Sequence, residues 1–303
     1  MKRILICGSN GLLGQRLSMM LSSQTEFEVL NTSMERSFVF DDRLYDYTQL
    51  DITHRGDVRS LVSSFQPTVI MNAAAATDVD WCEGHREEAW KINVIGAENL
   101  AEAARKVGAR LIHVSTDYVF DGRNGPYRED AQPNPLGYYG KTKLASENAI
   151  RGAAIAHAIV RTMILYGSGI NIKNNFPLWV VNSLRNGQRI RVVDDQFGNP
   201  THVSDLAMAI VRIFELSREG TYHVCGSELL NRYEFALRIA DVFGLDRSLI
   251  DRVKSSDLQQ PSPRPMMSGF ITLKAETELG IRFMSATQGL TLLKRELHQY
   301  IRN

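Results

Sequence analysis

The stretch RILICGSNGLLGQRL, residues 3–17, decides the fold. An apolar run ends at Cys7, glycines follow at positions 8, 11 and 14, and an amphipathic segment begins among them. Glycines in the spacing GxxGxxG between a strand and a helix predict a tight turn whose backbone N–H groups can approach a phosphate. A loop that is rich in glycine by chance is the alternative. The context of strand and helix favours the phosphate-binding turn.

Outward from this turn, the first half of the chain alternates short apolar runs with amphipathic segments. Apolar runs rich in β-branched residues predict buried parallel strands, and periodic segments predict helices. This alternation, continued over roughly 165 residues, predicts a doubly wound sheet with right-handed crossovers. The expected strands are residues 3–7, 27–31, 68–72, 110–115 and 156–162, and the expected helices are residues 12–21, 57–65, 86–107 and 138–151.

The composition changes after Tyr166, where a polar, glycine-containing loop begins. Shorter elements follow, including strands at 189–193 and 220–225 and helices at 203–217 and 286–301. We therefore expect an α/β protein: a Rossmann-type doubly wound parallel sheet with a smaller, interleaved C-terminal substrate domain. The NAD(P)-binding Rossmann domain is expected to span residues 1–167 with a return segment at about 198–217, and the substrate-binding domain residues 168–197 and 218–303.

The charge balance and the cysteine content limit the class of protein. The 303 residues include 35 basic and 34 acidic side chains, so no basic surface is expected to attract nucleic acid. Three scattered cysteines suit a reducing compartment better than a disulfide scaffold. The chain has no run of apolar residues long enough to cross a membrane and no secretory signal at its start. We expect a cytoplasmic protein with a small-molecule substrate, without nucleic acid or membrane partners, and a possible homodimer.

A hydroxyl at a strand end and a Tyr–Lys pair predict a catalytic site. Thr116 ends the strand RLIHVST, and Tyr139 and Lys143 stand four residues apart in GYYGKTK, on one face of the expected helix. Hydride transfer to a carbonyl leaves an alkoxide that needs a proton. An ammonium near the phenol is expected to lower its pKa from about 10 towards neutral. The alternative is that Tyr139 and Lys143 form an ordinary surface pair. The glycine turn and the strand-end hydroxyl favour the catalytic interpretation.

The end of the second strand bears on the choice of dinucleotide. Enzymes that bind NAD usually place an acidic residue there, and none stands between Asn31 and Met34. Ser33 and Arg36 could instead meet a 2′-phosphate, so NADP is favoured over NAD. A solvated Arg36 is the alternative. Asp51 in QLDIT fits a helix cap or a bond to the adenine amino group equally well.

Five motifs resemble those of extended short-chain dehydrogenases, and most closely the dTDP-4-dehydrorhamnose reductase family. They are GSNGLLG (8–14), NAAAATDVDWCE (72–83), STDYVFDG (115–122), PLGYYGKTKLASE (135–147) and DDQFGNPTHVSDLA (194–207). The resemblance extends from residue 1 to about residue 217. It implies an oxidoreductase of dTDP-rhamnose biosynthesis that reduces the 4-keto group of a nucleotide-linked 6-deoxyhexose with NAD(P)H.

The resemblance also implies roles for individual residues. The catalytic residues would be Thr116, Tyr139 and Lys143. The dinucleotide would contact Tyr139 and Lys143 together with Gly8, Asn10, Gly11, Leu12, Gly14, Ser33, Arg36, Asp51, Ile52, Ala73, Ala74, Ala75 and Asn93. The sugar nucleotide would contact Thr77, Val79, Thr116, Asp117, Val119 and, in a flanking loop, Gln196. No metal ion is expected.

One position departs from the family pattern and leaves the substrate open. Where family members often carry a tryptophan, the segment RTMILYG has Ile164. Two alternatives remain. One is a sugar-nucleotide epimerase or dehydratase on the same scaffold, although a dehydratase usually has an Asp–Glu pair where Asp117 and Tyr118 stand. The other is a dinucleotide-binding regulatory subunit without turnover, like the related beta subunit of methionine adenosyltransferase.

Overall fold

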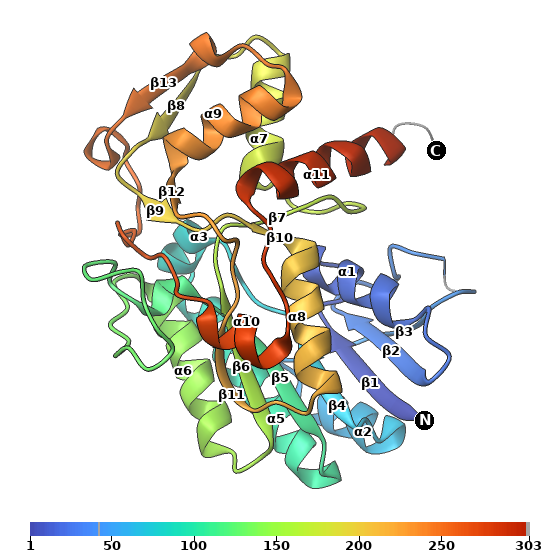
Figure 1. The fold of residues 1–303 in the computed structure, drawn as a ribbon. Coiled ribbons are helices and arrows are strands. Elements are labelled where there is room, and N and C mark those ends of the chain that lie inside the picture. Colours follow the sequence, from blue (N-terminus) through green and yellow to red (C-terminus); the bar gives the residue numbers. More distant parts are fainter. Residues whose placement is uncertain (42, 301–303) are drawn as a thin grey trace.

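A seven-stranded parallel sheet forms the centre of the molecule (Figure 1). The structure, a computed structural model, describes residues 1–41 and 43–300. The strand order is β11-β6-β5-β4-β1-β2-β3, in which the chain starts in the middle and winds outward in both directions. The strands are β1 (Lys2–Cys7), β2 (Phe27–Ser33), β3 (Asp46–Gln49), β4 (Val69–Asn72), β5 (Arg110–Thr116), β6 (His157–Thr162) and β11 (Gly220–His223). The predicted fold class is confirmed.

Helices cover both faces of the sheet because the inner strands carry apolar side chains on both sides. One face packs against α1 (Leu12–Leu21), α8 (Val203–Glu215) and α10 (Leu273–Leu279). The other packs against α2 (Arg55–Phe65), α5 (Gly96–Val107) and α6 (Tyr138–Gly152). Between β4 and α5 lie α3 (Val79–Gly84), α4 (Arg86–Trp90) and a π-helical turn, η1 (Lys91–Ile95), so the predicted helix 86–107 is interrupted by one widened turn.

Two strands of the sheet differ from the sequence prediction. The edge strand β3 was not predicted, since its residues DYTQ are polar and mostly exposed. Strand β11 was predicted as part of the substrate domain, but it pairs with β6 in the central sheet. That assignment of residues 220–223 is wrong, because pairing with a distant strand leaves no local signal in the sequence. The remaining division into two domains stays a prediction.

A smaller part lies at the end of the sheet towards which the strands run (Figure 1). It contains α7 (Phe176–Arg185), α9 (Arg232–Phe243) and α11 (Ala286–Tyr300), which share a hydrophobic core with the parallel pair β8 (Ile190–Val193) and β13 (Ile250–Val253). The short pairs β7 (Leu165–Tyr166) with β10 (Thr201–His202) and β9 (Phe197–Gly198) with β12 (Leu230–Asn231) lie where the chain passes between the two parts. Residues 301–303, the end of the predicted terminal helix and substrate segment, lie outside the described residues.

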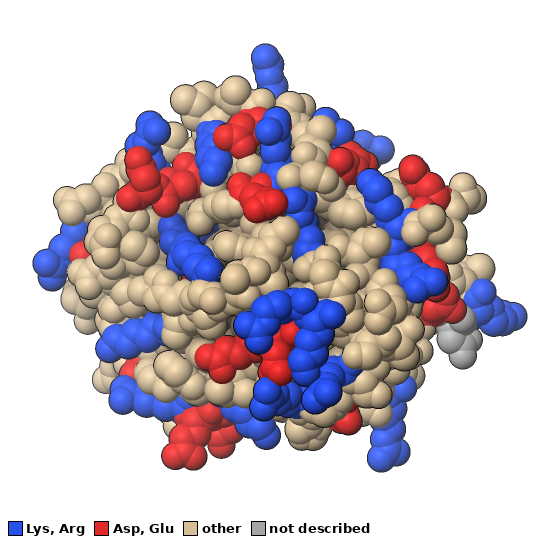
Figure 2. Space-filling view, turned by 90° about the horizontal axis from the view of Figure 1, so that it is seen from below, with Lys and Arg blue, Asp and Glu red and all other residues tan. Residues whose placement is uncertain are grey.

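Two further features bear on the expected partners: helices that could cross a membrane, and the distribution of charge on the surface. Across residues 1–41 and 43–300, no helix has both the length and the apolar content that a membrane crossing requires. On the face shown in Figure 2, Lys and Arg side chains lie among Asp and Glu side chains, and no uninterrupted basic surface is visible there.

Candidate active site

The predicted catalytic residues meet at the carboxyl end of β5. Thr116 is the last residue of this strand, and Tyr139 and Lys143 occupy the first two turns of α6. All three are buried, with exposed fractions of 5%, 8% and 2%. Helix α6 begins directly after Gly137, where an added Cβ would lie 2.4 Å from Ser262 Oγ, so the loop from the C-terminal part approaches the start of the helix closely. The trio is therefore enclosed between the sheet and that loop.

The electrostatics of the pair differ from the sequence prediction. Burial raises the pKa of the Tyr139 phenol above its ordinary value, and a hydrogen bond with Thr116 only partly opposes this. The expected lowering of the Tyr139 pKa by Lys143 is therefore wrong for the chain alone. The Lys143 amine instead donates to the carbonyl oxygen of Val114 at 2.8 Å. Burial lowers the pKa of Lys143 to about 8, although the Glu147 carboxylate acts in the opposite direction.

Asp117 closes the site on the side of the C-terminal part. Its carboxylate accepts hydrogen bonds from Thr116 Oγ1 at 3.0 Å and from Ser268 Oγ at 2.6 Å. Burial raises the pKa of Asp117, and these two bonds oppose the change. Val119, predicted beside Asp117 to contact the sugar, has no exposed surface and packs in a hydrophobic cluster with Phe120. Its side chain therefore does not line an open site.

The glycine turn has the geometry expected of a phosphate-binding loop. Gly8 has φ +81°, and an added Cβ there would lie 2.7 Å from the backbone nitrogen of Ala74. At Gly14 a Cβ would lie 2.2 Å from the Gly8 carbonyl oxygen. No side chain caps the first N–H groups of α1, its first turn carries no acidic residue, and the buried Ser9 hydroxyl has no hydrogen-bond partner among the described residues. Free donors at a helix start fit the pyrophosphate of a dinucleotide.

Beside this turn, an acidic residue that the sequence analysis overlooked occupies the end of β2. The Glu35 carboxylate accepts hydrogen bonds from Ser33 Oγ and, at 3.3 Å, from Asn10 Nδ2. Asn10 Oδ1 also accepts from the N–H of Val39 at 3.1 Å, so this side chain holds the glycine turn against the loop after β2. Arg36 is exposed. The signal was an acid two residues beyond the end of β2 and four beyond the expected strand end, in the region where dinucleotide-binding folds recognise the ribose.

The other predicted dinucleotide residues line the same end of the sheet. Asp51 Oδ1 accepts from the N–H of Thr53 at 2.9 Å, which supports the turn before α2. Ile52 is buried against Gly96 of α5. Asn93, in the π-helical turn, bonds both backbone polar atoms of Ala76 and thereby holds the loop that contains Ala73, Ala74 and Ala75. Leu12 packs partly buried at the start of α1. The dinucleotide contacts of all these residues stay predictions.

A cavity of about 420 Å³ lies in the C-terminal part of the molecule. Gln196, predicted as a flanking residue, lines it, while Thr77 is exposed after β4 and Val79 packs near Tyr139. The sequence analysis missed the remaining lining residues, which are Asn174, Asn175, Phe176, Trp179, Arg191, Val192, Val193, Arg232, Leu258 and Gln260. They come from four separate segments, so only the tertiary structure brings them together.

Arg232 links this cavity to the catalytic residues. Its guanidinium lies 5.4 Å from the centre of the Phe176 ring. Burial lowers the pKa of Arg232, and the neighbouring Tyr118 and Asp117 oppose this. A guanidinium in a partly dry cavity, with Arg191 also in the lining, is suited to bind an anion such as a diphosphate.

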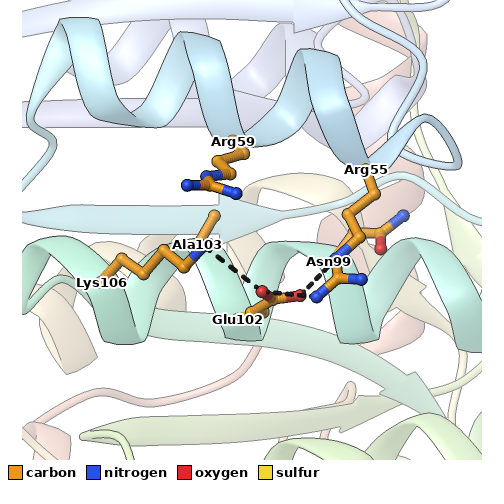
Figure 3. A pocket seen from close by; sticks show the side chains of 6 residues that line it. All are labelled: Arg55, Arg59, Asn99, Glu102, Ala103 and Lys106. Atoms are coloured by element: carbon orange, nitrogen blue, oxygen red, sulfur yellow. Dashed lines mark hydrogen bonds and ion pairs between the residues drawn. The ribbon is translucent and has the colours of Figure 1, made fainter.

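A second depression, between α2 and α5, has no comparable volume. Figure 3 shows Arg55 and Lys106 directed at the Glu102 carboxylate, with N–O distances of 2.7 and 3.5 Å. The ion pairs fill the groove, and such surface pairs stabilise a protein by little. Among the residues that the structure describes, no group of three or more His, Cys, Asp and Glu side chains is arranged to hold a metal ion.

Comparisons with known proteins agree with this geometry. The family model described as the RmlD substrate binding domain matches residues 1–298. The chain belongs to the dTDP-4-dehydrorhamnose reductase family. A dTDP-4-dehydrorhamnose reductase of Aggregatibacter actinomycetemcomitans is 33% identical over 93% of this chain and 95% of its own length. The spore coat polysaccharide biosynthesis protein SpsK of Bacillus subtilis is 35% identical over 93% of both chains. The predicted family is thus confirmed.

Solved structures of the reductase family share the whole fold. The dTDP-4-dehydrorhamnose reductase of Clostridium acetobutylicum superposes with a TM-score of 0.89 at 34% identity, over 98% of this chain and 99% of its own. The reductase of Bacillus anthracis, solved in complex with NADP, gives a TM-score of 0.84 at 32% identity, over 98% of this chain and all of its own. The resemblance therefore continues beyond residue 217, where the motifs in the sequence become sparse.

Ile164, the predicted departure from the reductase family, has an unusual backbone. Its φ is +44°, a conformation that β-branched residues rarely adopt. The side chain reaches Gly198, where an added Cβ would lie 2.8 Å from Ile164 Cδ1. A residue with such a strained backbone persists only where its surroundings hold it in place.

Proposed function

We propose that this protein reduces the 4-keto group of a nucleotide-linked 6-deoxyhexose with NADPH or NADH. The observation that carries the proposal is the buried Tyr139 phenol, on which Thr116 acts, together with a cavity in the C-terminal part that two arginines line. The family relatives supply the reaction class, since one solved relative is a reductase in complex with NADP. The free donors of the glycine turn support dinucleotide binding.

The chain's own residues account for the proton half of the reaction. NADPH or NADH bound at the glycine turn would supply the hydride. As the carbonyl carbon gains that hydride, its π electron pair moves to the oxygen, and Tyr139 donates its phenolic proton there, so that a secondary alcohol forms. Thr116 holds the same oxygen through its hydroxyl. The positive charge of Lys143 stabilises the phenolate that remains until it is protonated again.

The cavity accounts for the nucleotide half of the substrate. Arg191 and Arg232 can pair with the two phosphates, because guanidinium groups bind phosphate oxygens in a bidentate manner. Phe176 and Trp179 provide flat apolar walls for a base. Thr77, Val79, Asp117 and Gln196 belong to the proposed sugar subsite between the cavity and Tyr139.

The test is a panel of 4-keto-6-deoxy sugar nucleotides offered with NADPH or NADH, in which oxidation of the reduced nicotinamide is followed by absorbance. Stoichiometric oxidation is expected with at least one of them. In Tyr139→Phe, turnover should fall by at least about 1,000-fold while the Kd for NADPH changes less than about twofold. A Tyr139→Phe variant that keeps more than a tenth of the activity would remove Tyr139 from its proposed role.

A second candidate function is a dinucleotide-binding regulatory subunit. It is favoured by one comparison: the methionine adenosyltransferase 2 subunit beta of Bos taurus is 34% identical over 84% of this chain and 76% of its own length. Such a subunit would bind NADPH without oxidising it in the presence of any keto sugar. An epimerase or dehydratase would convert a sugar nucleotide with no net oxidation of NADPH, so analysis of the sugar products, beside the absorbance readout, separates it from a regulatory subunit.

The location and the assembly are further parts of the proposal. Three buried free cysteines support a reducing compartment such as the cytoplasm. A homodimer is proposed from the family resemblance, and light scattering on the purified chain tests it through the mass in solution.

A further inference from the structure

An unbroken chain of hydrogen bonds connects the loop beside the glycine turn with Lys143. The N–H of Ala74 donates to Asn72 Oδ1 at 3.1 Å, and Asn72 Nδ2 lies 3.1 Å from His113 Nδ1. His113 Nε2 lies 3.0 Å from Ser146 Oγ, which donates to the carbonyl oxygen of Lys143 at 2.7 Å. The three polar side chains, Asn72, His113 and Ser146, are at most 2% exposed.

The first bond in this chain determines the tautomer of His113. A backbone N–H can only donate, so the oxygen of the Asn72 amide faces Ala74 and its NH2 group faces the imidazole. His113 Nδ1 must then accept, which leaves the ring proton on Nε2. Burial, together with the charge of Lys143, lowers the pKa of His113 well below its ordinary value, so the ring is neutral. The Nε2–H group donates to Ser146 Oγ, whose own proton is used by the Lys143 carbonyl.

In this tautomer the single Nε2–H group is shared between Ser146 Oγ and the Lys143 amine, because both lie within hydrogen-bond distance of Nε2. The amine nitrogen lies 3.2 Å from His113 Nε2. An ammonium has only donors, so it cannot be hydrogen-bonded by an N–H group, whereas a neutral amine can accept from it. The contact with His113 therefore favours the neutral form of Lys143, while the Val114 carbonyl at 2.8 Å accepts from either form.

We propose that His113, oriented by Asn72, is a positioning residue for Lys143: it holds the amine against Val114 and favours release of its proton within the active site. The mechanistic meaning rests on the proposed function, because a lysine poised to exchange its proton can restore Tyr139 after each turnover. The charged and titratable groups that act on the amine are His113 from β5 and Glu147 from its own helix α6, and Glu147 is paired with Arg161 from β6. Tyr139 lies one turn earlier on α6, and Asp117 from η2 (Asp117–Val119) acts on Tyr139.

Two substitutions should move the Lys143 titration in opposite directions. In His113→Gln, the amide oxygen can turn towards the ammonium, so the acid dissociation constant of Lys143 should fall at least about tenfold. In Ser146→Ala, the Nε2–H group of His113 loses Ser146 Oγ as an acceptor and can donate only to the amine, which favours the neutral amine. The acid dissociation constant of Lys143 should therefore rise about threefold. Neither substitution changes any of the charged groups around Lys143.

The titration is measured in the dinucleotide-free chain with 13Cε-labelled lysine, and the Lys143 signal is identified by its loss in Lys143→Arg. His223→Gln is the matched control, because His223 is also buried in the central sheet but contacts the Tyr127 carbonyl and Arg161 rather than Lys143. Circular dichroism establishes which variants are folded, and Ser146→Ala keeps the test available if His113→Gln does not fold. Lys143 midpoints that are unchanged in the folded variants, or shifted equally by His223→Gln, would overturn the proposal.

A second measurement separates this proposal from the proposed function. Wild-type oxidation of NADPH with the sugar-nucleotide panel tests the function alone. If the wild type turns over, the pH profile of kcat in His113→Gln should shift with the Lys143 midpoint, which a merely structural histidine would not cause. If the wild type does not turn over, the lysine titration still decides the role of His113.

Discussion

Replacing Lys143 by methionine should stabilise the protein at neutral pH while it removes activity. The Lys143 side chain is 2% exposed, and burial lowers its pKa from 10.5 to about 8. At 1.36 kcal/mol for each pKa unit, the buried ammonium costs about 3 kcal/mol of folding stability below pH 8. Methionine fills much of the same volume without a charge. The lost bond to Val114 offsets about 1 kcal/mol, which leaves a gain of about 2 kcal/mol.

The sign of the pH dependence follows from the direction of the shift. Between about pH 8 and pH 10.5 the unfolded chain still binds the proton that the folded chain has released, so the wild type becomes more stable as the pH rises. Methionine does not titrate. The advantage of Lys143→Met should therefore shrink by about 2 kcal/mol between pH 7 and pH 9.5, and taking the difference cancels the other titrating groups.

The assay is urea unfolding of both proteins at several pH values, followed by circular dichroism. Lys141→Met is the matched control, because Lys141 lies on the same helix but is exposed, and its replacement should leave the pH dependence as it is. If the free energies of unfolding of the wild type and Lys143→Met change in parallel with pH, the reasoning is refuted. Such a result would mean that the amine is hydrated, or that its contacts in the fold fully offset the loss of hydration. Turnover of the variant should be lost, as expected where a destabilised group serves function.

Three further predictions follow from the contacts. Gly14→Ala should abolish dinucleotide binding or folding, because its methyl group would lie 2.2 Å from the Gly8 carbonyl oxygen. In Gly11→Ala the methyl group would lie 3.3 Å from that oxygen, so the affinity for NADPH should fall by less than about tenfold. Calorimetry with NADPH compares the two variants. Glu147→Gln should lower the free energy of unfolding by about 3 kcal/mol, since it leaves the buried Arg161 without its anion. Because the pKa of Glu147 is lowered in the folded chain, the stability advantage of the wild type should disappear as the pH falls below that pKa. A loss under about 1 kcal/mol in chemical unfolding at neutral pH would contradict this. Arg232→Met should raise KM for the sugar nucleotide by about 10- to 100-fold and leave the Kd for NADPH unchanged, and an equal effect on both would place Arg232 outside the nucleotide subsite.

The sequence was most informative where the chemistry is local. The glycine turn, the strand-end Thr116 and the Tyr139–Lys143 pair each lie within a few residues of a strand or helix boundary, and parallel strands bring such boundaries to one edge of the sheet. Their meeting could therefore be predicted from spacing alone. Glu35 is also a local signal, because it lies two residues beyond the end of β2.

Contacts between distant segments could not be predicted in this way. Strand β11 joins the sheet through pairing with β6, and the cavity around Arg232 is built from four segments. The direction of the Lys143 amine depends on His113 and Val114, which lie about 30 residues earlier on another element.

The sequence by itself determined the Rossmann fold and the family and predicted the catalytic residues, because periodicity and motif spacing are properties of neighbouring residues. Only the tertiary structure decided how those residues are charged and what they face. Desolvation depends on every group packed around a side chain, and for Tyr139 and Lys143 it acts more strongly than the single neighbour that the sequence places beside each of them.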